Sequence, residues 1–476
     1  MTKTSLLFAA AALIALAALP ACAAEYWVDG RTGSDTNDGA AASPWQSLDK
    51  ANAALMPGDT CYVLARLYEN SQIAPARSGA EGAPITYRGR IADAQERPEI
   101  TGGKYGSIVS LHERSWVRVE DFKIHSPTEH DWVVRISGEN GHHNEILNCE
   151  ITDPEGYAPI VIANGASYNT VADCYIHDTG HGEEGSGDCI VLNYGAHHNT
   201  ITRNRCANAC HSQIMALNGS HHNTISHNEL YATRRDWAGA GVNLPLEAGS
   251  NTVVGNYIHD LGYITDQKCA IQIDSADNVI RSNTIANCGA FGIALQSYTY
   301  GSNRQEATGN LVANNTIYNT GRQGLMFVAK RDCVSRNNRI VNNIVVGSPA
   351  DWYGVDAWIM VFDTYHLDNK AEPGDWFGNV FENNLFFHRT PGEPNMVLYN
   401  HRGTPVTWSL AELEAAYPET LRGNLEADPQ FHAAQKGVFG LQPTSPAIDA
   451  GLDLGHPFHG KAPDLGAVET APEPAE

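Results

Sequence analysis

The sequence is poor in positive charge. It contains 31 Lys and Arg residues against 54 Asp and Glu residues, and its formal net charge is −23. A strongly acidic surface repels the phosphate backbone, so we do not expect nucleic acid as a partner. The same charge disfavours polyanionic substrates unless a local basic patch or bound cations reverse the field.

The sequence has only one long hydrophobic run, and it lies at the start. Lys3 precedes the apolar residues 6–19, and Ala-Cys-Ala follows at 21–23. This pattern predicts a signal peptide over residues 1–23 and an exported protein, periplasmic or extracellular. Leu-Pro-Ala-Cys at 19–22 also resembles a lipoprotein box, which would attach an outer-membrane lipid to Cys22. Because a membrane span needs about 20 apolar residues, we expect membrane contact only through that lipid.

Ten cysteines in an exported chain raise the question of disulfides. Without Cys22 nine remain, and most occupy repeat positions where a small apolar side chain would stack. Cys206 with Cys210, or Cys174 with Cys189, are close enough in sequence for a bridge. We favour stacked core thiols and leave the bridges as the alternative.

Internal periodicity is the strongest signal in the chain. Nine segments of one pattern follow one another at a spacing of about 25–30 residues. Each segment starts with Asn. Apolar residues follow two and seven positions after this Asn, and Cys or Asn follows five positions after it. The segments begin at Asn144, Asn169, Asn199, Asn223, Asn251, Asn278, Asn310, Asn338 and Asn379. Alternating β-branched residues predict strands with one buried face, and stacked Asn side chains can bond along the axis.

A second short strand follows a variable loop in most repeats. These strands are predicted at 159–162, 189–192, 213–217, 241–246, 270–273, 292–295 and 324–328. Coils of this length that return onto one another predict an all-β right-handed parallel β-helix, a solenoid with capped ends. We expect an N-terminal cap and first coils over 25–130, repeats with a substrate groove over 131–400, and a C-terminal cap and tail over 401–476.

Both ends carry features that suit caps. Residues 47–55 predict a short amphipathic helix that plugs the first coil, because an open solenoid end must be covered. The tail contains Ser-Pro-Ala-Ile-Asp-Ala-Gly at 445–451 and Ala-Pro-Asp-Leu-Gly-Ala-Val-Glu at 462–469. We expect this tail to cap the other end.

These end motifs carry a family resemblance. The opening Tyr-Trp-Val-Asp-Gly at 26–30, Gly-Ala-Pro-Ile at 82–85 and the closing 462–469 motif resemble family-9 pectate lyases and the wider group of exported β-helix carbohydrate-active proteins. The resemblance implies a β-helix that acts on polysaccharide. Those lyases carry a clustered-Asp calcium site and a lysine base on a later strand. The corresponding strand here, 270–274, has no lysine, so the catalytic motif is not matched.

The loops before consecutive central strands hold most of the charge. For β-elimination a uronate carboxylate is neutralised by calcium or Arg, and a base removes the C5 proton. The predicted calcium ligands are Glu183, Glu184 and Asp188. The predicted catalytic residues are Lys268, Arg234, Arg235, His211, Asp236 and Asp274. The predicted substrate-binding residues are Asn243, Gln272, Gln296, Trp237, Arg322 and Lys330.

The same residues admit other interpretations. A glycoside hydrolase needs two carboxylates about 5 Å or 6.5–9.5 Å apart, which Asp188, Asp236, Glu247 and Asp274 are candidates to supply. Glu183 and Glu184 are equally typical of a solvated loop. Arg234 and Arg235 beside Asp236 are equally typical of a surface ion pair. The leading hypothesis is a monomeric, secreted polysaccharide lyase acting on a uronate-containing glycan. The alternatives are a glycoside hydrolase and a non-catalytic polysaccharide-binding or adhesin protein.

Overall fold

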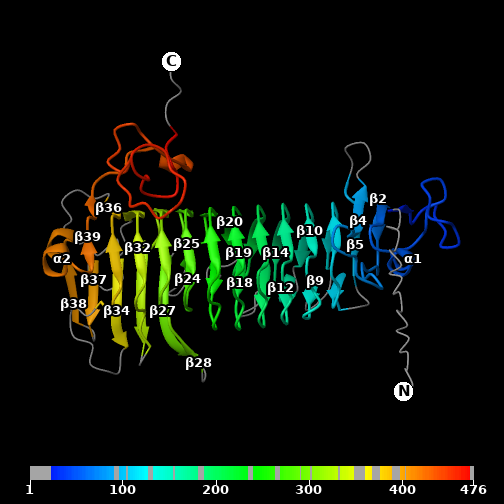
Figure 1. The fold of residues 1–476 in the computed structure, drawn as a ribbon, viewed down its shortest axis with the longest axis horizontal. Helices are drawn as coiled ribbons and strands as arrows, with labels where there is room; N and C mark the ends of the chain where they lie inside the picture. The colour runs from blue at the N-terminus through cyan, green and yellow to red at the C-terminus, as the bar shows by residue number, and fades with distance from the viewer. Residues whose placement is uncertain are drawn as a thin grey trace, which may run out of the picture.

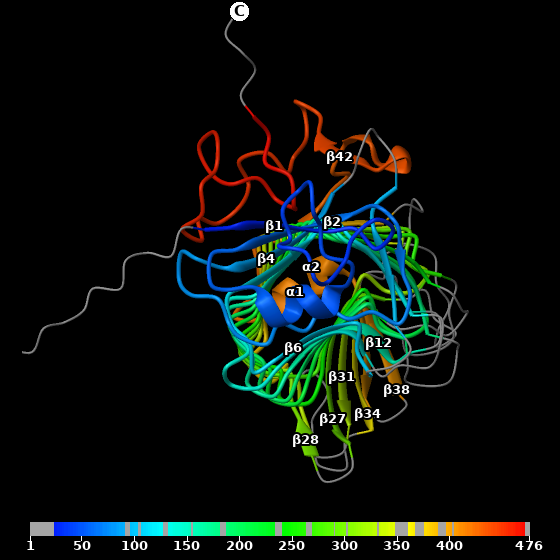
Figure 2. The same cartoon turned by 90° about the vertical axis from the view of Figure 1, so that its right-hand side faces the viewer.

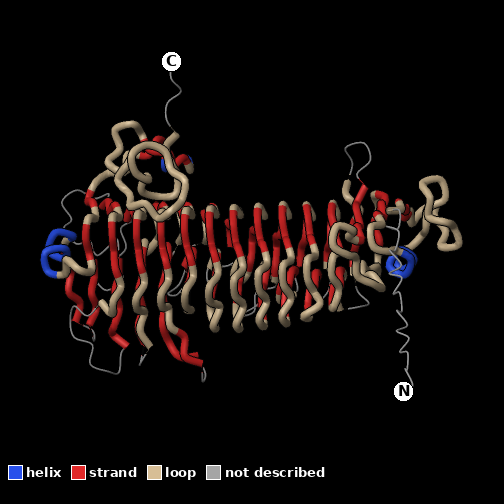
Figure 3. Tube along the Cα trace, viewed as in Figure 1, coloured by secondary structure: helices blue, strands red, loops and turns tan. Residues whose placement is uncertain are grey.

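The fold is an elongated rod of stacked coils, seen in a computed structural model (Figure 1). The structure describes residues 23–90, 96–102, 106–126, 132–153, 156–180, 187–233, 240–262, 269–289, 291–300, 303–330, 333–347, 360–366, 376–388, 397–401 and 404–471. Three long sheets run along the rod, and each successive coil adds one parallel strand to each sheet. Figure 3 shows strands stacked through the whole rod and a helix at each end. This is the predicted right-handed parallel β-helix.

Two of the sheets form the walls joined by the short Asn-containing turn. The first sheet orders β1 (Glu25–Val28), β2 (Thr60–Leu64), β4 (Ile85–Arg90), β7 (Val117–Glu120), β10 (Glu145–Leu147), β13 (Thr170–Ala172), β16 (Thr200–Thr202), β19 (Thr224–Ser226), β22 (Thr252–Val254), β25 (Val279–Arg281), β29 (Leu311–Ala313), β32 (Arg339–Val341), β35 (Val380–Glu382) and β39 (Leu421–Arg422). The second sheet orders β3 (Leu67–Tyr68), β5 (Glu99–Thr101), β8 (Lys123–His125), β11 (Glu150–Asp153), β14 (Tyr175–Thr179), β17 (Arg205–Ala209), β20 (Glu229–Thr233), β23 (Tyr257–His259), β26 (Thr284–Ala286), β30 (Thr316–Tyr318), β33 (Ile344–Gly347), β36 (Leu385–His388) and β40 (Leu425–Glu426).

The third sheet contains the second strands predicted for each repeat. It orders β6 (Val109–His112), β9 (Trp132–Ser137), β12 (Ala158–Ala163), β15 (Ile190–Asn193), β18 (Ile214–Ala216), β21 (Val242–Leu244), β24 (Cys269–Ile273), β27 (Phe291–Tyr300), β31 (Leu325–Lys330), β34 (Met360–His366), β37 (Val397–His401) and the antiparallel β38 (Thr404–Trp408). The strand β27 is longer than predicted because it continues into a hairpin with β28 (Asn303–Gln305). This hairpin projects from the rod in Figure 1.

The predicted repeat pattern fills the core. The apolar residues at the third and eighth positions of each segment line the interior, as Ile225 and Leu230 do, both fully buried. Two asparagine ladders stabilise the turns. In the first, Nδ2 of Asn199 donates to Oδ1 of Asn223 at 3.0 Å. In the second, Nδ2 of Asn228 donates to Oδ1 of Asn256 at 2.9 Å. Each buried amide therefore finds a partner on the next coil.

The stack begins earlier than the Asn pattern indicated. Strands β1, β2, β4 and β7 precede Asn144 in the first sheet and pair in parallel with one another. Their interior residues, among them Val63, Ile85 and Val119, are fully buried. The first coils thus use the same apolar core without the asparagine that marks the later ones.

A helix closes the rod at each end. The helix at the N-terminal end was predicted, whereas the one at the C-terminal end lies in the predicted cap and tail region 401–476 but outside the tail motifs. At the N-terminal end α1 (Leu48–Ala54) covers the coil with Leu48, Ala51 and Leu55, as predicted. At the other end α2 (Leu410–Ala416) buries Leu410 and Leu413. Viewed along the rod, both helices lie over the coil interior (Figure 2).

The tail motifs do not cap the end, so that prediction is wrong. Leu441, Ala447 and Leu465 pack instead against the outer face of the second sheet, beside Ile344 and Val346. The tail includes a small hairpin of β41 (Phe431–Ala433) and β42 (Val438–Leu441), joined through the turn η1 (Ala434–Lys436). Apolar side chains that point outward from the second sheet provide the surface on which this tail folds.

The cysteines are core thiols. All nine described cysteines are buried and none is in a disulfide, including the pairs considered for bridges. Burial raises the pKa of Cys288 to about 12, so this thiol is neutral at physiological pH. Cys22 and most of the predicted signal peptide lie outside the described residues. Among the described helices, none has the length and apolar character required to traverse a bilayer.

Candidate active site

The outer face of the third sheet carries the predicted substrate-binding positions. Strand alternation places Val242 and Ile271 in the core, so their neighbours Asn243 and Gln272 point outward. In register with these two, the earlier coils present Val161, Val191 and Met215. The outer face is therefore apolar over β12 to β18 and becomes polar at β21 and β24.

A buried carboxylate and an imidazole meet at the beginning of this face. Asp188 immediately precedes the strand region of β15, is fully buried, and lies one coil before His211. His211 Nδ1 lies 2.8 Å from Asp188 Oδ1, and the backbone N–H of Ser212 donates to the same oxygen at 2.7 Å. Because a carboxylate only accepts, the proton of neutral His211 resides on Nδ1. Its Nε2 is then unprotonated and able to accept a proton.

His211 is accessible while its partner is not. The His211 side chain is 23% exposed, and that of Asp188 is 0% exposed. The second carboxylate oxygen, Oδ2, has no hydrogen-bond partner within the described part of the chain. This arrangement is suited to proton transfer at the surface of the third sheet.

Tyr157 belongs to the same group. Backbone N–H groups of Gly187 and Asp188 donate to its carbonyl oxygen at 2.8 and 3.1 Å. Burial, and secondarily the charge of Asp188, raise the pKa of the Tyr157 phenol to about 12. Tyr157 therefore remains protonated at neutral pH. Tyr157 was not among the predicted catalytic residues, although it occupies the position just before β12 that corresponds to the start of the Asp188 strand.

A second polar group surrounds Asp274, just after β24. Its Oδ2 accepts from Gln272 Nε2 at 2.7 Å and from the Tyr298 hydroxyl at 3.1 Å. Asp274 and Glu247 line a cavity of about 400 Å³ together with Arg304 and Glu306 of the hairpin segment. Gln305 completes the hairpin contact by accepting from the backbone N–H of Leu246 at 2.8 Å.

The groups around Asp188 and Asp274 are separate. Asp188 lies before its strand and Asp274 lies after its strand, and three strand spacings separate β15 from β24. At about 4.8 Å for each spacing, the separation exceeds what a carboxylate pair of a glycosidase allows. Asp188 and Asp274 therefore cannot form that pair.

The remaining predicted site residues fall into two sets. Gln296 lies on β27, with Nε2 3.7 Å from Cys269 Sγ, and the Arg322 guanidinium lies 5.7 Å from the centre of the Phe291 ring. Lys330 ends β31. The residues outside the described ranges are Glu183, Glu184, Arg234, Arg235, Asp236, Trp237 and Lys268. Their predicted roles stay predictions.

The described donors do not by themselves make a calcium site. No group of three or more His, Cys, Asp or Glu side chains within the described ranges is arranged to hold a metal ion. Calcium takes six to eight oxygen ligands, whereas Asp188 Oδ1 is already engaged by His211 and Ser212. The calcium prediction thus depends on Glu183 and Glu184.

Two family models match the chain. One, described as a right-handed beta helix region, matches residues 107–263. The other, described as a protein of unknown function (DUF1565), matches residues 253–388. No curated protein matches the chain.

Solved structures share the fold at low sequence identity. A mannuronic acid specific polysaccharide family 6 lyase from human gut microbiota is 14% identical over 87% of this chain and 93% of that chain, with a TM-score of 0.53. The GH136 lacto-N-biosidase from Eubacterium ramulus is 14% identical over 84% of this chain and 67% of that chain, with a TM-score of 0.52. The PL6 family alginate lyase AlyGC is 16% identical over 83% of this chain and 54% of that chain, with a TM-score of 0.51. These similarities establish the β-helix fold.

Proposed function

We propose that this protein is an exported polysaccharide-degrading enzyme that binds its substrate on the outer face of the third sheet. The observation that carries the proposal is the contact between buried Asp188 and accessible His211. A buried carboxylate that fixes the tautomer of a surface imidazole is a common arrangement in acid–base catalysis. The similar folds of two polysaccharide lyases and a lacto-N-biosidase support a glycan as the substrate.

The proposed reaction is β-elimination on a uronate-containing glycan. His211 Nε2 accepts the C5 proton, the electron pair forms the C4–C5 double bond, and the C4–O bond breaks. Neutral Tyr157 is the candidate acid that protonates the departing oxygen, because its pKa of about 12 keeps it protonated. Arg234 and Arg235 are the proposed groups that neutralise the uronate carboxylate.

The test is incubation of the purified protein with a panel of polyuronates, with and without a calcium chelator. Elimination produces an unsaturated sugar that is followed by its ultraviolet absorbance. We expect absorbance to rise with the wild-type protein and to stay flat with His211→Ala. An exposed histidine in the tail provides the matched control, His456→Ala. Activity in His211→Ala equal to that of the control would contradict the assignment, and a loss with chelator would implicate Glu183, Glu184 and Asp188.

A glycoside hydrolase is the second candidate, favoured by the cavity that Asp274 and Glu247 line together. Here one carboxyl group would protonate the glycosidic oxygen, and the other would activate water or attack the sugar. New reducing ends without ultraviolet absorbance, lost in Asp274→Asn, would move the assignment to this cavity. No reaction on a broad panel would leave a polysaccharide-binding protein.

A further inference from the structure

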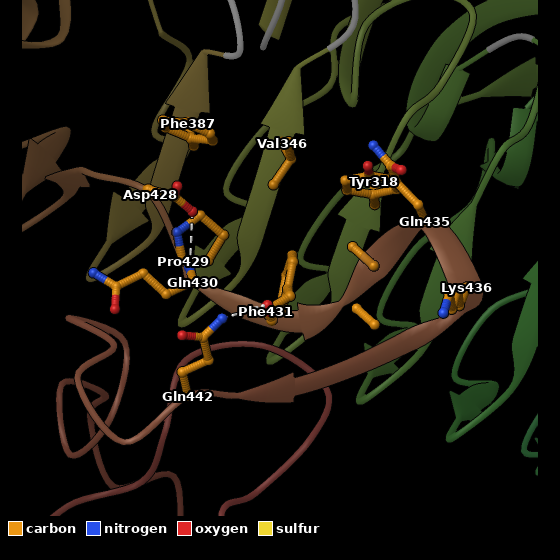
Figure 4. Close-up of a pocket in the computed structure, with 12 residues that line it drawn as sticks. Tyr318, Val346, Phe387, Asp428, Pro429, Gln430, Phe431, Gln435, Lys436 and Gln442 are labelled. Carbon is orange, nitrogen blue, oxygen red and sulfur yellow. Dashed lines mark hydrogen bonds between the residues drawn. The ribbon is translucent and has the colours of Figure 1, made fainter.

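A cavity lies away from the third sheet, on the outer face of the second sheet. It has a volume of about 830 Å³ and separates the outer face of the second sheet from the hairpin β41–β42 and the turn η1. Figure 4 shows the hairpin crossing Phe387, Val346 and Tyr318. Volumes of about 300–1,000 Å³ are typical of small-molecule sites.

The floor of this cavity is apolar and regular. Tyr318, Val346 and Phe387 are in register on β30, β33 and β36, and all three project outward from the second sheet. Phe431 on the hairpin side stands nearly perpendicular to Tyr318, with ring centres 6.4 Å apart. Tyr318 and Val346 are buried, at 7% and 2% exposure, so the half-buried rings of Phe387 and Phe431 provide the aromatic surface of the cavity. Aromatic rings suit the apolar faces of pyranose rings.

The rim of the cavity is polar and nearly balanced in charge. Gln442 donates from Nε2 to the carbonyl of Phe431 at 3.0 Å. Its Oε1 has no hydrogen-bond partner among the residues that the structure describes. Gln435 and Lys436 are exposed and likewise have no side-chain partner within those ranges. Asp428 provides the opposite charge. Amides both donate and accept, as sugar hydroxyl groups require.

From this combination we propose a second carbohydrate-binding site in this cavity, for neutral pyranose units of a polysaccharide. One Asp and one Lys leave no net charge to recognise a uronate, and the chain as a whole carries −23. The site lies on the second sheet, whereas Asp188 and His211 lie on the third. It therefore serves to hold glycan rather than to cleave it, and it does not depend on the proposed lyase activity.

A cavity-filling substitution tests the site. Ala433 lines the cavity and His432, its neighbour on β41, is exposed and does not. The alternation of a strand places these two side chains on opposite faces. We would compare Ala433→Trp with the matched control His432→Trp, using calorimetric titration with cellohexaose, mannohexaose and xylohexaose. The rim variant Gln435→Ala/Lys436→Ala gives a second measurement that leaves the packing intact.

We expect wild-type protein to bind at least one hexasaccharide with a dissociation constant below about 5 mM. Ala433→Trp should weaken this binding about tenfold or more, the rim variant about threefold, and His432→Trp not at all. Absence of binding to wild type, or equal binding to all four proteins, would overturn the proposal. So would sedimentation showing a wild-type dimer that Ala433→Trp dissociates, because a second copy would then occupy the cavity. Failure of the polyuronate assay leaves these titrations unaffected.

Discussion

Asp188 Oδ1 and His211 Nδ1 lie 2.8 Å apart on successive coils, 23 positions apart in the chain. Replacing Asp188 by Asn should keep the shape of the side chain but place an amide group where the carboxylate now accepts from His211 Nδ1. We expect kcat to fall by about 10²–10⁴-fold with KM nearly unchanged, because the imidazole loses its tautomer and its charge partner. Asp178 forms a similar contact, 2.7 Å from His177 Nδ1, on another sheet. Asp178→Asn is the control and should leave kcat unaltered.

Tyr298 distinguishes the two proposed reactions. Its hydroxyl donates to Asp274 at 3.1 Å, so Tyr298→Phe removes one hydrogen bond from that carboxylate without removing the ring. For a hydrolase we expect about a tenfold or greater loss of kcat/KM and a shifted pH profile. For a lyase that uses His211 the rate should change less than about twofold. Both rates come from steady-state assays on the substrate that the panel identifies.

The hydrogen bonds of the asparagine ladder should contribute to the free energy of unfolding. Asn256 Nδ2 donates to the Ile225 carbonyl and to Asn283, and its Oδ1 accepts from Asn228. Asn256→Ala leaves these buried groups without partners, and we expect the free energy of unfolding to fall by about 3 kcal/mol. Thr252→Ala, a half-buried outward residue on the same coil, should cost less than about 1 kcal/mol. Urea titration of both variants provides the comparison.

Histidine pairs at the turns predict a pH dependence of stability. His197 and His198 have Nδ1 atoms 2.9 Å apart, and His221 stacks on His197 with ring centres 5.1 Å apart. Burial first, and the neighbouring imidazoles second, lower the pKa of His197 and of His221. The unfolded chain, with an ordinary pKa of about 6.5, then binds more protons than the folded one. Stability should therefore be lost as the pH falls through about 6.5. The variant His197→Asn/His221→Asn should lose less between pH 7.5 and 5.5 in urea titrations, and an unchanged slope would argue against this origin.

The buried thiols predict insensitivity to reducing agents. None of the nine described cysteines is in a disulfide, and burial raises the pKa of Cys288 to about 12. We expect a thiol reagent to modify none of them within about an hour in native protein and all nine after denaturation. The melting temperature should be the same with and without dithiothreitol. A lower melting temperature in reductant would instead require a disulfide.

Much of the β-helix could be predicted because its signal is local and repeated. The repeated Asn and Ile positions define the register of the coils, and this register brings Asp188 beside His211 on the next coil. The early coils were less evident because residues such as Ile85 and Val119 lack the accompanying asparagine. The long β27 and its hairpin depend on contacts such as Gln305 with Leu246, 59 positions away, which no short window contains.

The path of the tail could in principle be predicted from β30, β33 and β36, where the alternation of apolar inward and polar outward residues is interrupted. Tyr318, Val346 and Phe387 are large apolar residues at an outward position. Earlier coils have a mixed set there, namely His177, Ala207, Tyr231, His259 and Ala286. Outward apolar residues in three successive strands indicate a covered surface. What covers them is a separate question, because the partner segment lies about a hundred residues farther along the chain.

The two end helices also affect what each end of the rod offers to another molecule. Every coil within the molecule is built by backbone pairing along strand edges. The outer edge of β1 is already paired, because the N–H of Trp27 donates to the carbonyl of Gly39 and the N–H of Trp45 donates to the carbonyl of Trp27. Leu48 and Leu413 are seated over the apolar interior at the two mouths of the rod. Deletion of α1 or α2 should therefore expose apolar surface and favour end-to-end association of rods.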